Sequence, residues 1–168
     1  TLYPVLSVSS GDVEISNCTF SYNCAVAGGA VYLENSSGIL SNCFFNNNIS
    51  YHHDKGGGAV CVENDEEIVL FDTCTFNDNS AVRGGGLYAI SANVVNCSFI
   101  SNEASRGGGG LRLQTGRVEN CTFSENSSGT NGGGLLSIDA EIDQCTFQTN
   151  LAEKNGGGLS FQNSNISN

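Results

Sequence analysis

The chain of 168 residues has no methionine, no tryptophan, one proline and only six lysines and arginines. Against these six basic residues stand 17 aspartates and glutamates, for a formal net charge of −11. This balance disfavours nucleic acid and anionic membranes as partners and permits cations or basic partners. No apolar run reaches the roughly 20 residues that span a bilayer, and alanine- and glutamate-rich helical stretches are also missing. The absences therefore point away from nucleic-acid-binding, membrane-spanning and helical proteins.

What the chain does contain is a repeat, six copies of Cys-x-Phe-x-x-Asn, each followed by a glycine run. Successive cysteines lie 25, 31, 23, 24 and 24 residues apart, a period that fits a leucine-rich repeat or one turn of a parallel β-helix. Apolar residues alternate at period two, as in Leu111-x-Leu113 and Val60-x-Val62, which indicates strands. We therefore predict an all-β fold, a right-handed single-stranded parallel β-helix of about seven rungs of about 24 residues.

The phase of the apolar residues predicts where each rung bends. Cysteine and phenylalanine, two apart, share one face of a strand, but the residue three before each cysteine is also apolar. A corner must therefore lie between, as at Glu119-Asn120, and a second is expected after phenylalanine, where asparagine tolerates left-handed backbone. The glycine run is the third irregular place. Because rungs stack about 4.8 Å apart, identical residues should form ladders in the core. The cysteine and phenylalanine ladders comprise Cys18, Cys43, Cys74, Cys97, Cys121, Cys145, Phe20, Phe45, Phe76, Phe99, Phe123 and Phe147.

Residues 1–168 are expected to form one β-helix segment that is cut in mid-rung at both ends. Residues 1–13 align with the strand after a glycine run, and Ile166-Ser167-Asn168 matches Ile15-Ser16-Asn17. Without an initiator methionine or signal peptide, we expect a mature or excised segment. Neither end carries the polar cap that stacked repeats need. We therefore expect the coil to continue in a longer chain or by end-to-end self-association into a fibre.

Sequons for N-glycosylation are dense, and three share one repeat position, Asn-Cys-Thr/Ser, beside an inward-facing cysteine. Outward-facing acceptors of this kind predict covalent glycans and an extracellular or cell-surface location. Two further sequons lie at the corner after phenylalanine and are poor acceptors if their side chains point inward. The expected sites are Asn17, Asn35, Asn96, Asn120 and Asn165, and the two poor ones are Asn48 and Asn126.

Eight cysteines in an extracellular chain suggest disulfides, but six of them form the predicted column. Neighbours in that column fall within the Cα range for a bridge, yet their parallel Cβ vectors would strain it. We therefore expect mostly reduced thiols that pack as small apolar groups. Disulfides between some neighbouring cysteines of the column are the alternative. Cys24 and Cys61 lie outside the column, and their pairing is not assigned. No paired spacing of the zinc-finger type exists.

Three polar clusters could carry chemistry. His52, His53 and Asp54, in the insertion 50–55, could bind a divalent metal, although a polar loop explains them equally. The acidic run 63–67 could bind Ca²⁺, but it lacks the EF-hand spacing, so a solvated loop is favoured and no cofactor is otherwise predicted. A third cluster lies on one outer strand face, where paired carboxylates could hydrolyse a glycan or merely face water. It comprises Asp139, Glu141 and Asp143.

The pairing of Phe-x-x-Asn with Gly-Gly-Ala-Val resembles the repeats of chlamydial polymorphic outer-membrane proteins. It occurs as 20–23 with 28–31 and as 45–48 with 57–60, and later copies carry glycine and leucine in place of alanine and valine. The resemblance implies the pectin-lyase-like right-handed β-helix found in passenger domains of surface adhesins. Similar repeats occur in large extracellular proteins of algae and other protists, and the sequon density favours such a eukaryotic relative.

The same resemblance sets the functional alternatives. Pectate lyases and polygalacturonases share the superfamily, but their sites need basic residues and clustered aspartates. This chain has few basic residues and lacks the Asn-Thr-Asp, Gly-His-Gly and Arg-Ile-Lys motifs. We therefore expect a non-enzymatic extracellular structural or adhesive glycoprotein, a rigid stalk or filament subunit, with a polysaccharide lyase or hydrolase as the alternative. An ice-binding face, a third possibility, requires an unbroken threonine ladder. The ladder in this chain is interrupted by Phe44 and Ser98. Its members are Thr19, Thr75, Thr122 and Thr146.

Overall fold

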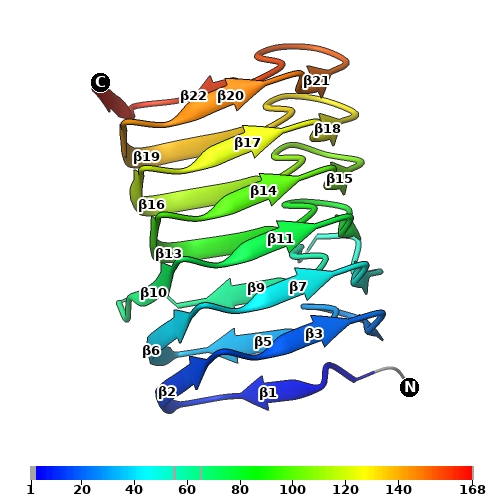
Figure 1. The fold of residues 1–168 in the computed structure, drawn as a ribbon, viewed down its shortest axis with the longest axis vertical. Helices are drawn as coiled ribbons and strands as arrows, with labels where there is room; N and C mark the ends of the chain where they lie inside the picture. The colour runs from blue at the N-terminus through cyan, green and yellow to red at the C-terminus, as the bar shows by residue number, and fades with distance from the viewer. Residues whose placement is uncertain (1–2, 55, 65, 168) are drawn as a thin grey trace.

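The computed structural model describes residues 3–54, 56–64 and 66–167 as a parallel β-solenoid of about seven turns of roughly 24 residues. The chain climbs from one rung to the next along a single axis, with the N-terminus at one end and the C-terminus at the other (Figure 1). The described residues contain no helix. Every strand pairing among the described residues is parallel and joins equivalent positions of successive repeats, as in Phe99 with Phe123. The predicted fold class is confirmed.

The rungs build three parallel sheets. The eleven strands of the first sheet are β1 (Leu6–Val8), β2 (Gly11–Ser16), β5 (Val31–Glu34), β6 (Ser36–Ser41), β9 (Val60–Glu63), β10 (Val69–Asp72), β13 (Leu87–Val95), β16 (Leu111–Glu119), β19 (Leu135–Asp143), β22 (Leu159–Phe161) and β23 (Asn165–Ser167). The six strands of the second sheet are β3 (Thr19–Ser21), β7 (Phe44–Asn46), β11 (Thr75–Asn77), β14 (Ser98–Ile100), β17 (Thr122–Ser124) and β20 (Thr146–Gln148). The six strands of the third sheet are β4 (Cys24–Ala25), β8 (Ile49–Ser50), β12 (Ser80–Ala81), β15 (Glu103–Ala104), β18 (Ser127–Ser128) and β21 (Leu151–Ala152).

Two corners of each rung are made by single residues with positive φ. The first is the residue before the repeated cysteine, such as Asn120 with φ 51°. The second is the residue before the repeated asparagine, such as Glu125 with φ 58°, and not the asparagine itself. The sequence placed left-handed backbone at that asparagine; the structure instead turns its side chain into the core, where Asn126 is fully buried. There its amide is hydrogen-bonded to the asparagines of the neighbouring rungs, Asn102 and Asn150.

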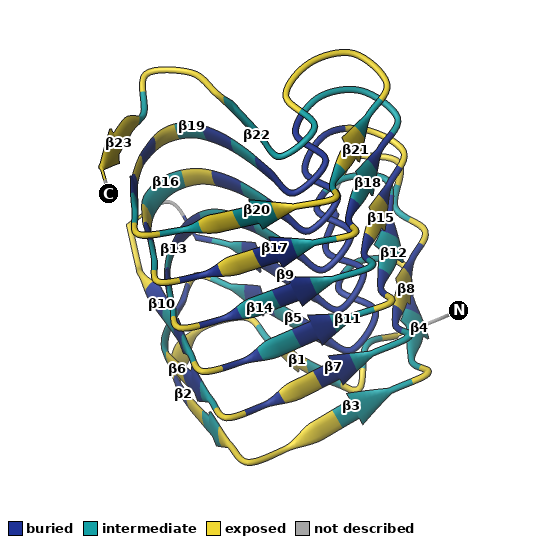
Figure 2. Ribbon diagram, turned by 45° about the horizontal axis from the view of Figure 1, so that its top comes forward, coloured by how far each residue is buried: buried dark blue, intermediate teal, exposed yellow. Residues whose placement is uncertain are grey.

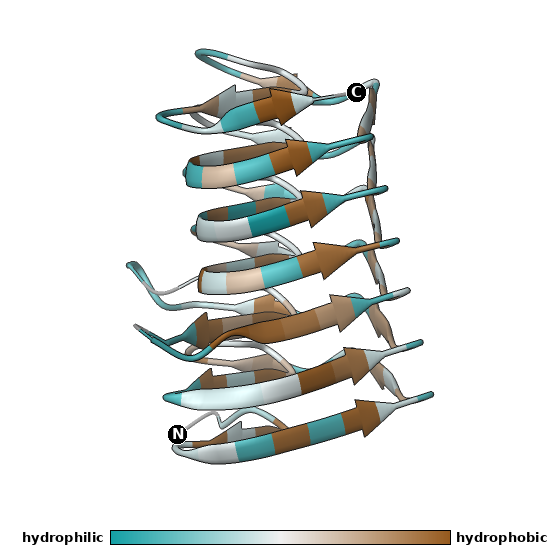
Figure 3. Ribbon diagram, turned by 90° about the vertical axis from the view of Figure 1, so that its left-hand side faces the viewer, coloured by the Kyte–Doolittle hydropathy of each residue, from teal (hydrophilic) through white to brown (hydrophobic). Residues whose placement is uncertain are grey.

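The core lies inside the coil and consists of the predicted ladders. Figure 2 shows buried segments lining the interior of successive rungs, and Figure 3 shows hydrophobic segments recurring near the same place from level to level. Neighbouring phenylalanine rings of the ladder stack nearly parallel, with centroids 5.1, 4.8, 4.8, 4.9 and 5.0 Å apart from Phe20 to Phe147. The end members Phe20 and Phe147 are only partly buried, and Cys18 is exposed. The cysteine and phenylalanine ladders are therefore present, and complete only in the inner rungs.

Phe99→Ala should lower the free energy of unfolding by about 3–5 kcal/mol, as is usual for a large core side chain. The ring of Phe99 is fully buried between Phe76 and Phe123. Phe44→Ala is the matched control because Phe44 belongs to the same sheet but is 50% exposed. It should change stability by no more than about 0.5 kcal/mol. Urea unfolding of both variants checks the difference, and equal losses would contradict a stacked interior ladder.

Candidate functional site

A ladder of asparagine amides runs through the corner between the second and third sheets. The Asn102 amide nitrogen donates to the carbonyl of Phe76 on the rung before and to Oδ1 of Asn126 on the rung after, both at 2.9 Å. Its Oδ1 accepts from the backbone N–H of Asn79 at 3.0 Å and from the Asn79 amide at 2.9 Å. The amide is therefore fully hydrogen-bonded although it has no access to solvent.

The same pattern joins six asparagines along the axis, from Asn23 to Asn150. Burying an amide is favourable only when its donors and acceptor are all matched, and stacking identical amides achieves this at every inner rung. The recurrence of asparagine three residues after each phenylalanine was visible in the sequence. Its inward orientation was not, because asparagine also suits an exposed left-handed turn.

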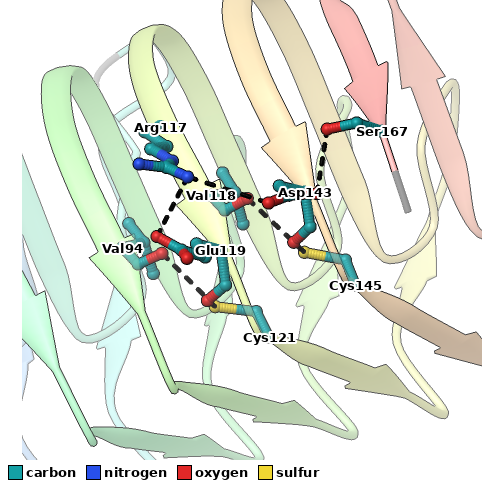
Figure 4. Close-up of polar contacts among 8 residues, drawn as sticks. All are labelled: Val94, Arg117, Val118, Glu119, Cys121, Asp143, Cys145 and Ser167. Atoms are coloured by element: carbon teal, nitrogen blue, oxygen red, sulfur yellow. Dashed lines mark hydrogen bonds and ion pairs between the residues drawn. The ribbon is translucent and has the colours of Figure 1, made fainter.

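The cysteine column directly follows the first corner of each rung, and its four inner members are buried. No disulfide joins any of the eight cysteines, all of which are in the described part of the chain. Figure 4 shows the Cys121 sulfhydryl donating to the carbonyls of Glu119 and Val94, at 3.2 and 3.4 Å. Cys145 donates likewise to Asp143 and Val118. Each inner thiol is thus bound to its own rung and to the preceding one.

Burial raises the pKa of the Cys43 thiol above its usual range. Hydrogen bonding with the sulfhydryls of Cys121 and Cys74, together with burial, raises the pKa of Cys97 as well. The opposite shift occurs at Cys74 and Cys121, where hydrogen bonds with neighbouring sulfhydryls lower the pKa of the thiol. The shifts alternate along the column because adjacent thiols hydrogen-bond to one another. Thiolate is the nucleophilic form, but all four inner thiols are buried, so burial keeps them from reagents in solvent.

Thiol labelling should distinguish the inner column from the outer cysteines. In native reduced protein, Cys18 is exposed and Cys24 half-buried, and both should react rapidly with an aromatic disulfide reagent. Cys74 and Cys97 should react at least about 100-fold more slowly, because reaction requires local opening of the rungs. Mass spectrometry of alkylated peptides over time makes the comparison. Labelling of all eight at one rate in folded protein would show that the column is open to solvent.

The two cysteines outside the column have different surroundings. Cys24 begins β4 and is half-buried. Cys61 lies in β9 between the two core residues Val60 and Val62, so alternation turns it to the outer face, where it is nevertheless fully buried. In register, it is flanked by Tyr32 and Tyr88.

The sequon asparagines fall into two structural groups. Asn17, Asn96 and Asn120 are exposed at the first corner, with φ near 50°. Asn35 is exposed at another turn, and Asn165 is exposed in β23. The two predicted poor acceptors are inside the asparagine ladder, where both are fully buried. These are Asn48 and Asn126. The geometry thus matches the predicted division of the sequons, while glycosylation itself stays a prediction.

Two of the candidate metal ligands in the insertion, His53 and Asp54, are exposed, and His52 is half-buried. The rings of His52 and His53 stack with centroids 4.9 Å apart, and His53 Nε2 lies 3.1 Å from Asp54 Oδ2. Arg83 approaches the other Asp54 carboxylate oxygen at 3.5 Å. Among the described residues, no group of three or more histidine, cysteine, aspartate or glutamate side chains could hold a metal ion. Lys55, at the end of this insertion, lies outside the described residues.

The acidic run is partly built into the fold and is not wholly a solvated loop. The Asn64 side chain is fully buried: its Oδ1 accepts from the Ser36 N–H at 3.0 Å, and its amide donates to the Ser36 carbonyl. Glu63 accepts a 2.6 Å hydrogen bond from the Tyr32 hydroxyl. Only Glu66 and Glu67 of the described residues in this run are exposed as expected, and Asp65 lies outside the description. A solvated loop leaves its polar groups to water, whereas here Asn64 satisfies the backbone of the preceding rung.

The carboxylates of β19 lie on its outer face, as alternation predicted. Figure 4 shows Arg117 between two acidic side chains, with its Nη2 at 3.3 Å from Glu119 and 3.7 Å from Asp143. Asp143 also accepts from the Ser167 hydroxyl at 2.8 Å. The structure thus gives Asp143 an ordinary surface ion pair, and a pair of this kind contributes little energy.

Two arginines, Arg83 and Arg112, lie near each other where the glycine turns meet the first sheet. Arg112, on the outer side of β16, is partly buried, and burial together with nearby Arg83 lowers its pKa. Among the described residues, no carboxylate is paired with Arg112, whereas Arg83 is paired with Asp54. Tyr88 lies next to Arg112 in the register, and burial raises the pKa of its hydroxyl. A shallow hollow elsewhere, over the third sheet, contains Glu103 and Glu153 but no basic residue.

This architecture defines the class of protein as a parallel β-solenoid with amide, thiol and aromatic ladders in its interior. The family model described as "Right handed beta helix region" matches residues 5–168, and the chain belongs to that family. Comparison with curated proteins and with solved structures gave no significant match. Domains of this family occur in enzymes and in non-enzymes, so membership establishes the fold and leaves activity to the site.

Within the described ranges, the structure has no helix that is both long and apolar enough to cross a bilayer.

Proposed function

We propose that this chain is a non-enzymatic, extracellular structural or adhesive segment, a rigid stalk or filament subunit that carries N-glycans. The observation that supports it most is the continuity of the ladders: phenylalanine and asparagine repeat through six successive rungs without a substitution. A catalytic site is singular, whereas here the buried polar groups are repeated and are used to join rungs. Rigid stacking of this kind suits a spacer.

The coil is proposed to extend along its axis, either within a longer chain or by self-association. Strand edges at the end of a solenoid present unpaired backbone groups that can template a further rung. The outermost members of the ladders, Phe20 and Phe147, are partly exposed, so a further rung at either end would bury them.

Negative-stain electron microscopy of the secreted protein, with and without glycan removal and reductant, tests the stalk. Long rods or filaments of uniform width are expected. Short discrete particles under all conditions would rule out the filament and leave the alternative as the function to test.

Glycan mapping tests the extracellular part of the proposal. In folded protein secreted from eukaryotic cells, enzymatic deglycosylation in heavy-oxygen water should label Asn17, Asn96 and Asn120. Asn48 and Asn126 should be unlabelled, because a glycan there would leave their ladder partners without hydrogen bonds. Peptide mass spectrometry reads out each site. Labelled Asn126 in folded protein, or no labelled site at all, would contradict the proposal.

The alternative, a polysaccharide lyase or hydrolase, keeps one supporting observation. Arg112 is a partly buried guanidinium with Tyr88 beside it and no carboxylate paired with it among the described residues. Such a spot suits an anionic group. Release of reducing or unsaturated ends from acidic polysaccharides, abolished in Arg112→Ala, would establish the alternative, and no release by the native protein would exclude these substrates.

A further inference from the structure

The cysteine column has a spacing that bears on what it can bind. The adjacent strands of the second sheet run in register, so the residues that precede them also stack. The stacked cysteines are therefore about one strand spacing apart, close to 4.8 Å. The Cys74 N–H points to the Cys97 sulfur at 3.3 Å, and Cys97 interacts with the sulfhydryls of both its neighbours. The inner thiols thus lie one above another along the axis, and each sulfur contacts the backbone of the preceding rung.

A disulfide fits this spacing poorly. It needs an S–S distance near 2.05 Å and Cβ atoms about 3.8 Å apart. Parallel side chains on neighbouring rungs hold their Cβ atoms at roughly the strand spacing, about 1 Å too far. Closing the bridge would therefore pull two rungs together at one point, against the ladders on either side.

A two-coordinate soft cation fits better. Metal–thiolate distances are about 2.3 Å, so two sulfurs on opposite sides of one ion are about 4.6 Å apart. Such an ion needs only two ligands, so it does not require the three-residue cluster that the described residues lack.

We propose that adjacent thiols of this column, chiefly Cys74, Cys97 and Cys121, bind soft monovalent d¹⁰ cations of the copper(I) class linearly between rungs. Thiolate sulfur selects such cations over hard ones. Each ion replaces one thiol proton, so a thiolate–cation–thiol unit is neutral and avoids an uncompensated charge in the core. The half-buried Cys145 and exposed Cys18 give access from the ends of the column.

Silver(I) is the probe, because it has the same coordination preference and does not change oxidation state in air. Protein is reduced, freed of reductant by gel filtration, titrated with silver nitrate in chloride-free buffer, and desalted. Retained silver is measured by mass spectrometry, and its coordination by X-ray absorption. We expect retained silver with two sulfur neighbours near one distance and no nitrogen or oxygen neighbour, and a higher melting temperature.

Two variants separate the column from the other thiols. The double variant Cys97→Ala/Cys121→Ala should lose most of the retained silver, whereas Cys24→Ala should retain as much as the native protein. No retained silver, nitrogen or oxygen ligands, or a loss confined to Cys24→Ala would overturn the proposal, the last by showing surface-thiol binding only. If the double variant does not fold, the X-ray absorption spectrum of the native protein still decides.

Discussion

Asn102→Ala is expected to lower the free energy of unfolding by about 4 kcal/mol or more, an exceptional loss for one polar side chain. The side chain makes four hydrogen bonds, all to groups on adjacent rungs. Its removal leaves four groups without a hydrogen-bond partner: the backbone N–H and a side-chain amide proton of Asn79, the Phe76 carbonyl and one acceptor site of Asn126. Each unsatisfied buried group costs about 1–3 kcal/mol, and water does not reach a position with no solvent access.

Asn77→Ala provides the control, on the rung that precedes that of Asn102. The Asn77 side chain faces outward from β11, and its one side-chain hydrogen bond among the described residues goes to the neighbouring carboxylate of Asp78. Its replacement should change stability by no more than about 0.5 kcal/mol. Urea unfolding monitored by circular dichroism compares both variants with the native protein. Equal small losses would show that the asparagine ladder is not what holds the rungs together.

Gly109→Ala should have a comparable or larger effect, for a steric reason. A Cβ at this position would lie 2.1 Å from the Gly133 carbonyl oxygen and 2.4 Å from that of Ser127. Both obstacles are backbone atoms of the next rung, held in the ladder, so no side chain can move aside. Overpacking a core ordinarily costs about 1–3 kcal/mol, and here the strands themselves must separate. We expect little soluble folded protein.

The matched control is Gly157→Ala, at the same repeat position in the last rung. Its Cβ would lie 2.9 Å from the carbonyl oxygen of Asn150 and 3.8 Å from the carbonyl carbon. The local strain should be absorbed more easily, because the Cβ meets one peptide group of its own rung and no backbone atom of a neighbouring described rung. Soluble yield and melting temperature are the measurements. If both variants folded equally well, close approach of the rungs at the glycine turns would be wrong.

Much of the fold could be predicted because the sequence repeats itself. One segment of alternating apolar residues indicates a strand. Six such segments in the same phase also indicate how the strands pair, so Phe99 stacks on Phe123 as expected. The register near the C-terminal end follows as well, since Ile166 pairs with Ile142. In a solenoid each rung contacts only its neighbours, so local pattern carries most of the tertiary information.

What could not be predicted lies where one residue type fits two structures or where the repeat is interrupted. Asparagine suits an exposed left-handed corner, as at Asn120, and an inward ladder, as at Asn126. The two environments differ only in contacts that appear once the rungs stack. Asn64 occurs in an insertion with no counterpart in other repeats, so its bond to Ser36 had no periodic signal. Burial of Cys61 on an outer face likewise follows an interruption.

The most direct test of the ladder-stacked core is a nuclear Overhauser spectrum of the ring protons in protein labelled only at phenylalanine. We expect contacts that link the six ladder rings in order, from Phe20 to Phe147, because neighbouring centroids are no more than 5.1 Å apart. We expect no contact that skips a rung, such as Phe45 with Phe99. Missing neighbour contacts, or contacts between non-adjacent rungs, would contradict the parallel stacking on which the proposed rigid stalk depends.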